Sequence, residues 1–158
     1  LTVFVFFGPV AVLGTGWLLT GGLSASGAWA ASAMGSLCAA ALAVNNHRDI
    51  AHDRRAGRQT FAVRFGPGAS QRLLAALLAW PFLAVSGLAL GTAQAWPLLS
   101  LVLAPSAWRL YRDFVRCPAG LAYNGILFRL FHLALWLAAL LSLSALIGPL
   151  LPAHLGEG

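Results

Sequence analysis

The chain has few charged residues and few cysteines. The first shortage argues against an ordinary soluble domain, and the second against a disulfide-linked or zinc-binding protein. Only 9% of its 158 residues are charged, against about 25% in a typical soluble domain, so water is not its main solvent. Cys38 and Cys117 stand far apart, without a CxxC or Cys/His spacing, and indicate neither a disulfide framework nor a zinc site. Lysine is absent, so all ten residues counted as Lys or Arg are arginines.

An initiating methionine and a recognisable signal peptide are lacking too. The chain opens directly on the apolar stretch LTVFVFFGPVAVLG, with neither a charged leading region nor a small-residue cleavage site. We therefore expect an N-terminal part of the natural protein to precede Leu1.

Long apolar blocks dominate what is present. Hydrophobic residues make up 59% of the chain, and a bilayer core about 30 Å thick needs about 20 of them for each helical crossing. The blocks predict an all-α, polytopic transmembrane helical bundle in a single domain, with the lipid bilayer around it. Its five helices are expected at about residues 1–20, 27–46, 70–91, 95–111 and 126–148.

The arginines are distributed unevenly over the connections between these blocks. The connections near residues 21–26 and 92–94 contain none, whereas arginines flank the other two, at Arg48, Arg54, Arg55, Arg58, Arg64 and Arg72, and at Arg109, Arg112, Arg116 and Arg129. Cytoplasmic connections carry such an excess of basic residues. Residues 47–69 and 112–125 are therefore predicted to be cytoplasmic. Topology explains the net charge of +6, and we expect no nucleic-acid partner.

The first of these connections carries a candidate site. If the second helix continues past residue 46, Asn45, Asp49 and Asp53 fall on one face at one-turn intervals. Carboxylates suit Mg²⁺, which keeps several waters and binds substrate phosphates as well. Arginine forks match phosphate oxygens. The pattern predicts Mg²⁺ at Asp49 and Asp53 and phosphate contacts from the surrounding arginines. With the longer motif described below, Asn45 becomes a ligand or an orienting group, and Arg48, Arg58 and Arg64 become the expected diphosphate contacts.

A simpler interpretation remains open for the spacing alone. Asp49 and Asp53 would then only pair with neighbouring arginines such as Arg54 and Arg55 in a solvated interfacial cluster. Arg129 and His132, three residues apart in the last helix, allow two readings in the same way. They either face a cavity, as ionisable groups in membranes tend to do, or Arg129 extends to the interface.

The longer string NNHRDIAHDRRAGRQTFAVRFG, residues 45–66, resembles the second aspartate-rich motif of the UbiA-like intramembrane aromatic prenyltransferases. Within that superfamily it is most similar to the branch that acts on 1,4-dihydroxy-2-naphthoate. The stretch FVFFGPVAVLGT resembles the fifth helix of the same enzymes. Two departures stand out: Arg58 replaces the usual lysine, and no first motif of the NDxxDxxxD kind is present. The matching motif positions are Asn45, Asn46, Arg48, Asp49, Asp53, Gly57, Thr60, Ala62, Val63, Arg64 and Gly66.

The resemblance implies a fold and an activity. The chain would be the C-terminal five helices of a nine-helix enzyme in the bacterial cytoplasmic membrane. That enzyme would transfer a polyprenyl group from polyprenyl diphosphate to 1,4-dihydroxy-2-naphthoate, giving demethylmenaquinone in menaquinone biosynthesis. Mg²⁺ would be its cofactor, with Asp49 and Asp53 as catalytic residues. The missing N-terminal half would carry the first aspartate motif, so we expect this chain to be inactive by itself.

Two alternatives are kept. Another branch of the superfamily would use 4-hydroxybenzoate, homogentisate, haem or a chlorophyllide as acceptor, although the AVRFG string, residues 62–66, favours the naphthoate branch. A small transporter subunit or scaffold, with arginines that only set topology, would be no enzyme at all.

Overall fold

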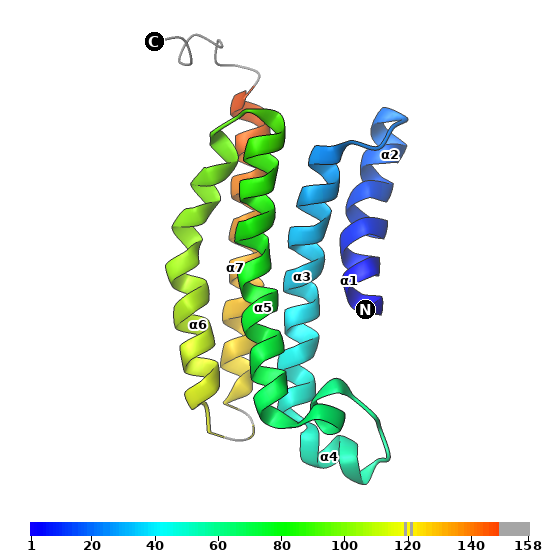
Figure 1. The fold of residues 1–158 in the computed structure, drawn as a ribbon, viewed down its shortest axis with the longest axis vertical. Coiled ribbons are helices and arrows are strands. Elements are labelled where there is room, and N and C mark those ends of the chain that lie inside the picture. The colour runs from blue at the N-terminus through cyan, green and yellow to red at the C-terminus, as the bar shows by residue number, and fades with distance from the viewer. Residues whose placement is uncertain (119, 121, 149–158) are drawn as a thin grey trace.

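The computed structural model describes residues 1–118, 120 and 122–148, and this part of the chain is helical without strands. Figure 1 shows the long helices side by side in a bundle, with α1 at one edge and α6 at the other. The predicted all-α polytopic bundle is confirmed, and the protein is a multi-pass membrane protein. Four described helices are long and apolar enough to cross a membrane: Thr2–Thr20, Ala25–Arg48, Phe61–Thr92 and Tyr123–Ile147.

The first crossing is one rod built from three pieces, α1 (Thr2–Val5), the π-helix η1 (Phe6–Leu13) and α2 (Gly14–Thr20). Pro9 lies inside η1 and has no N–H to donate. A local change to the π pattern is one way in which a membrane helix satisfies the carbonyls that a proline frees. The rod ends at Gly21, whose φ of 73° is left-handed.

The second crossing, α3 (Ala25–Arg48), packs against this rod through small residues. Ser24 caps it by accepting a hydrogen bond from the Gly27 N–H at 3.0 Å. A Cβ added to Gly8 would lie only 2.5 Å from the carbonyl oxygen of Ala31, and one added to Gly35 would lie 2.6 Å from that of Phe4. The two backbones therefore touch, as small-residue stripes allow in membranes.

The segment after α3 differs from the expected loop over 47–69. A short helix, α4 (Ile50–Arg55), follows at once, and α5 (Phe61–Thr92) begins at Phe61 rather than near residue 70. Thr60 explains the early start, because its side chain accepts a hydrogen bond from the Val63 N–H and caps the helix. The Arg-rich connection is thus mostly helical, with only a short turn between α4 and α5.

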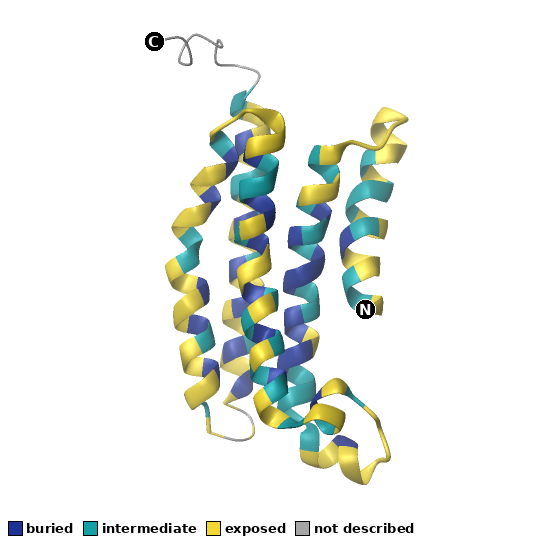
Figure 2. Ribbon diagram, viewed as in Figure 1, coloured by how far each residue is buried: buried dark blue, intermediate teal, exposed yellow. Residues whose placement is uncertain are grey.

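The remaining helices complete the bundle. The helix expected at 95–111 is a 3₁₀ helix, η2 (Trp96–Leu103), continued by α6 (Ala104–Arg116), and the last is α7 (Tyr123–Ile147). Figure 2 shows the buried residues on the faces where α3, α5, α6 and α7 meet. The Ser36 hydroxyl ties α3 to α5 there by donating to the Leu77 carbonyl at 2.7 Å. The largest fully buried apolar side chains are Leu37, Leu74, Leu110, Phe114, Leu130 and Leu137.

Candidate functional site

The junction between α3 and α4 holds the predicted polar residues. Asp49 separates the two helices, with φ −96° and ψ 11°. Helical hydrogen bonds nonetheless run through it, because the Asp49 N–H donates to the Asn45 carbonyl at 3.0 Å and the Asp53 N–H to the Asp49 carbonyl at 2.8 Å. Asn45, Asp49 and Asp53 therefore follow one another at intervals of one turn.

Arg48 holds the Asp49 carboxylate with both arms of its fork. Its Nε donates to Oδ1 at 2.8 Å and its Nη2 to Oδ2 at 2.9 Å, while its Nη1 donates to Oδ1 of Asn124 at 2.9 Å. The hydrogen bonds from Arg48 hold the pKa of the Asp49 carboxyl below its usual range, so this group is ionised at neutral pH. Asn124 is on α7, and Arg48 thus connects the end of α3 to α7.

Asp53 is in a different environment from Asp49. Its side chain is only 6% exposed, against 39% for that of Asp49. Arg58, itself 67% exposed, approaches Oδ1 of Asp53 at 3.4 Å, which is long compared with the 2.7–2.9 Å typical of charge-assisted hydrogen bonds. The backbone of Arg58 also donates to the Asp53 carbonyl at 2.9 Å. Asp53 is a buried acid with a weakly held partner, and buried charges are normally paired or bound to a metal.

Three residues of the motif shape its backbone. Gly57 has a φ of 70° in the turn after α4, where a left-handed residue is needed. Gly66 has φ 82° and ψ 173° and breaks α5 near its first turns, just before Pro67. Together with the cap at Thr60, these glycines fold the chain from α4 back toward the bundle.

The other predicted residues are more loosely placed. Asn45 is half-buried and Arg64 is exposed on the first turns of α5. The Cζ of Arg64 lies 5.3 Å from the centre of the Phe65 ring. Within the described residues, no hydrogen bond or ion pair joins Arg64 to either aspartate. The structure therefore pairs Arg48 with Asp49 and Arg58 with Asp53, and leaves Arg64 beside the site.

His47 faces the interior of the bundle. Its ring centre lies 4.7 Å from that of Phe114 and 5.8 Å from that of Tyr123. Its Nδ1 is buried and has no hydrogen-bond partner in the part of the chain that the structure describes. His47 thus packs the end of α3 against α6 and α7.

The donor chemistry fits a hard cation. Among the described residues, no three of the side chains His, Cys, Asp and Glu gather as a transition-metal site would require. The two carboxylates match the one or two that Mg²⁺ usually takes from a protein. Asp49 can still bind a cation, because a carboxylate has about four lone-pair positions and the Arg48 fork occupies two of them.

An apolar groove of about 450 Å³ adjoins the motif. We call it the α3 groove; Asn46 and Phe61 line the end that belongs to the motif, and α1, α3 and α5 supply the walls. The lining residues are Leu1, Val3, Phe4, Ala39, Leu42, Ala43, Asn46, Phe61, Leu73 and Leu77. An extended hydrocarbon chain suits such a lining.

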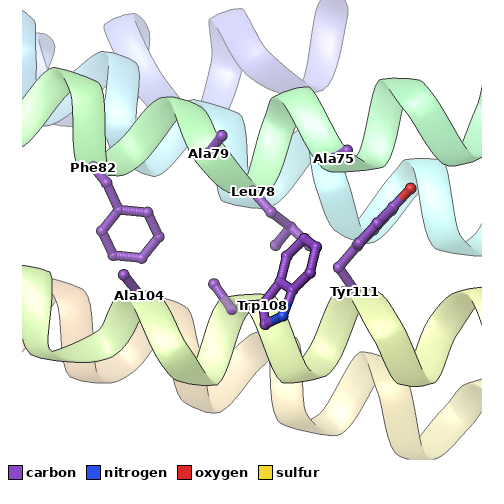
Figure 3. A pocket seen from close by; sticks show the side chains of 8 residues that line it. Ala75, Leu78, Ala79, Phe82, Ala104, Trp108 and Tyr111 are labelled. Atoms are coloured by element: carbon purple, nitrogen blue, oxygen red, sulfur yellow. The ribbon is translucent and has the colours of Figure 1, made fainter.

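A second groove, of about 330 Å³, lies between α5 and α6. Figure 3 shows the rings of Phe82, Trp108 and Tyr111 beside the small side chains of Ala75 and Ala79. No residue of the aspartate motif lines it. It therefore has no part in the candidate site.

Most of the chain matches a known protein family. The model of the UbiA prenyltransferase family matches residues 1–121, which include the whole of the aspartate motif. The chain belongs to the UbiA prenyltransferase family. Membership places α3, α4 and the start of α5 within the part that the family shares. Residues beyond 121, including Asn124, lie outside the match.

Three similar UbiA-family relatives illustrate the range of the likeness. A 1,4-dihydroxy-2-naphthoate octaprenyltransferase of Mycobacterium tuberculosis is 43% identical over 69% of this chain and 37% of its own length. That of Haemophilus influenzae is 34% identical over 94% of this chain and 48% of its own length. The human UbiA prenyltransferase domain-containing protein 1 is 34% identical over 84% of this chain and 40% of its own length. The chain thus spans less than half the length of these relatives, and no solved structure matches it.

Proposed function

We propose that the full-length protein transfers a polyprenyl group from polyprenyl diphosphate to 1,4-dihydroxy-2-naphthoate, giving demethylmenaquinone, in the cytoplasmic membrane of a bacterium. The observation that carries the proposal is the pair Asp49 and Asp53, one turn apart and beside arginines, in a motif whose Asn46 and Phe61 line an apolar groove. Two of the relatives above bear the name of this activity. The naphthoate acceptor rests on that likeness and on the AVRFG string.

The polar residues of the motif would have different roles at the diphosphate. Asp49 and Asp53 would hold Mg²⁺, and Asn45 would complete or orient that set. When bound, the ion neutralises negative charge on the departing diphosphate. Arg58 and Arg64 are exposed and free to turn their forks toward phosphate oxygens. Arg48 holds the Asp49 carboxylate in place through its two short hydrogen bonds.

The apolar residues serve the prenyl tail. With the diphosphate at Asp49 and Asp53, a tail that enters the α3 groove would pass between Asn46 and Phe61 and lie along Leu73 and Leu77. Burial of the tail supplies about 0.8 kcal/mol for each CH₂ group. The same lining keeps water from the electron-poor allylic carbon, which water would otherwise attack.

Substitution of the aspartates in the full-length protein tests the proposal. Asp49→Asn and Asp53→Asn should each lower prenyl transfer at least about 100-fold, the scale seen when a group that stabilises developing charge is removed. An amide keeps the shape of the carboxylate and loses the charge that binds the ion. Asp113→Asn is the matched control, because Asp113 pairs with Arg129 on other helices, and it should leave activity unchanged.

Two further measurements complete this test. Membrane insertion and thermal stability of the Asp→Asn variants should equal those of the parent, which separates lost chemistry from lost fold. The 158-residue chain alone should show no turnover, because it lacks the first aspartate-rich motif, of the NDxxDxxxD kind. Full activity in Asp53→Asn, or prenyl transfer by the isolated chain, would refute the proposal.

A further inference from the structure

A separate polar pocket lies between α6 and α7, away from the aspartate motif. It measures about 240 Å³, and we call it the α6–α7 pocket. Its polar lining is Ser106 and Arg109 from α6 with Arg129 and His132 from α7. Its apolar lining is Leu103, Leu110, Leu133 and Trp136. Two arginines and a histidine therefore line one hollow together with apolar side chains.

The depth of this pocket suits a lipid head group. Arg129 is six residues into α7, or about 9 Å from its start, and Arg109 is seven residues before the end of α6, or about 10 Å. The 25 residues of α7 extend about 37 Å, somewhat more than the 30 Å of a hydrocarbon core. Both arginines thus lie near the boundary between head groups and acyl chains, on the same side of the membrane.

The charges around the pocket do not balance. Arg129 donates from Nη1 to Oδ2 of Asp113 at 2.6 Å, which uses one of its five N–H donors. Arg109 is exposed and has no ion pair within the described residues. Arg112 and Arg116 on α6 add further positive charge nearby. A ligand with negative charge is needed for balance, because an uncompensated guanidinium near the hydrocarbon is costly.

We propose that the α6–α7 pocket binds an anionic phospholipid. The phosphate would accept hydrogen bonds from Arg109 and Arg129, with the Ser106 hydroxyl beside it. One acyl chain would lie along Leu103, Leu133 and Trp136. Charge complementarity selects this occupant, since an anionic head group brings net negative charge to two arginines, whereas the choline of the zwitterionic phosphatidylcholine adds a positive charge there. None of these residues belongs to the aspartate motif, so the site stands independently of the proposed activity.

Native mass spectrometry of the full-length protein, titrated with phosphatidylglycerol or phosphatidylcholine, tests the site. Wild type should bind phosphatidylglycerol more tightly, and Arg109→Gln should weaken that binding about fivefold, as expected for one arginine at an anionic membrane surface. Arg112→Gln is the matched control, because Arg112 is exposed on the same helix and lies outside the pocket. It should bind as wild type does. Arg109→Gln should also keep the thermal stability measured in detergent without added lipid.

Several outcomes would overturn the proposal. Equal binding of the two lipids would remove the case for charge recognition. An equal loss of phosphatidylglycerol affinity in Arg112→Gln would mean that the lipid is attracted by the positive charge of the whole surface and does not bind in the pocket. Displacement of phosphatidylglycerol by a polyprenyl diphosphate from wild type, but not from Arg109→Gln, would assign the pocket to the substrate.

Discussion

Asp49 and Asp53 are chemically identical, but the fold gives them different environments. The fork of Arg48 holds Asp49 at 2.8 and 2.9 Å, and 39% of the Asp49 side chain remains exposed. Asp53 is 6% exposed and has a single partner at 3.4 Å among the described residues. A buried charge costs several kcal/mol unless it is well paired. We therefore infer that Asp53 gains more than Asp49 from a bound cation.

The arginine that approaches Asp53 can be tested alone. Arg58→Ala in the full-length protein should raise the KM for polyprenyl diphosphate about tenfold, the loss of about 1.4 kcal/mol expected for a hydrogen bond to a charged group. Stability should fall by no more than about 1 kcal/mol, because the side chain is 67% exposed. Arg54→Ala is the control, an exposed arginine outside the motif positions, and its KM should match the parent. An equal rise in both variants would contradict a specific role for Arg58.

The helix α3 carries the site, and its position depends on backbone contact with the first rod. Gly8 and Gly35 lie so close together that neither has room for a side chain. A Cβ added to Gly8 would lie 3.0 Å from the Cα of Gly35, and one added to Gly35 would lie 3.1 Å from the Cα of Gly8. The face of α3 that carries Ala31 and Gly35 is therefore a packing surface against the first rod. Because Asn45 and Asp49 extend from the end of this helix, the glycine contact sets where the motif stands.

One added methyl group tests this contact. Gly35→Ala should lower stability by about 1–3 kcal/mol, the usual cost of overpacking, since the new Cβ would lie 2.6 Å from the Phe4 carbonyl oxygen. Gly16→Ala is the control within the first rod, where a Cβ meets no atom within 4 Å. It should be neutral or slightly stabilising, because alanine favours helix. Thermal unfolding of the full-length protein in detergent measures both, and equal midpoints would exclude a tight crossing.

At the scale of the whole molecule, the arginine-bearing segments gather at one end of the helical bundle. Figure 1 shows α4, the end of α6 and the start of α7 at one end of the bundle, and the connection between α2 and α3 at the other. The arginine-bearing segments therefore lie at the same end. The positive-inside rule then favours a cytoplasmic position for both.

Cysteine labelling in intact cells measures this orientation. In a background without Cys38 and Cys117, single cysteines replace Arg55, Arg116 and Gly22, all of which are exposed. A membrane-impermeant maleimide added outside should label Gly22→Cys and spare Arg55→Cys and Arg116→Cys. After the cells are opened, all three should react. Labelling of Arg55→Cys or Arg116→Cys from outside would contradict the predicted orientation.

The sequence by itself determined the membrane setting and the helical class. Apolar block length and arginine placement are properties of short stretches of chain, so they need no knowledge of packing. The spacing of Asn45, Asp49 and Asp53 was readable for the same reason, since one helical turn relates neighbours. The motif likewise identified the family before any contact was known.

Only the tertiary structure decided how these residues differ. The burial of Asp53, the bond from Arg48 to Asn124 and the inward position of His47 all depend on helices distant in sequence. The helix α5 begins at Phe61 rather than near residue 70 because Gly57 turns the chain after α4 and Thr60 caps the helix. Arg109 and Arg129 likewise share the α6–α7 pocket through packing, which no local periodicity encodes.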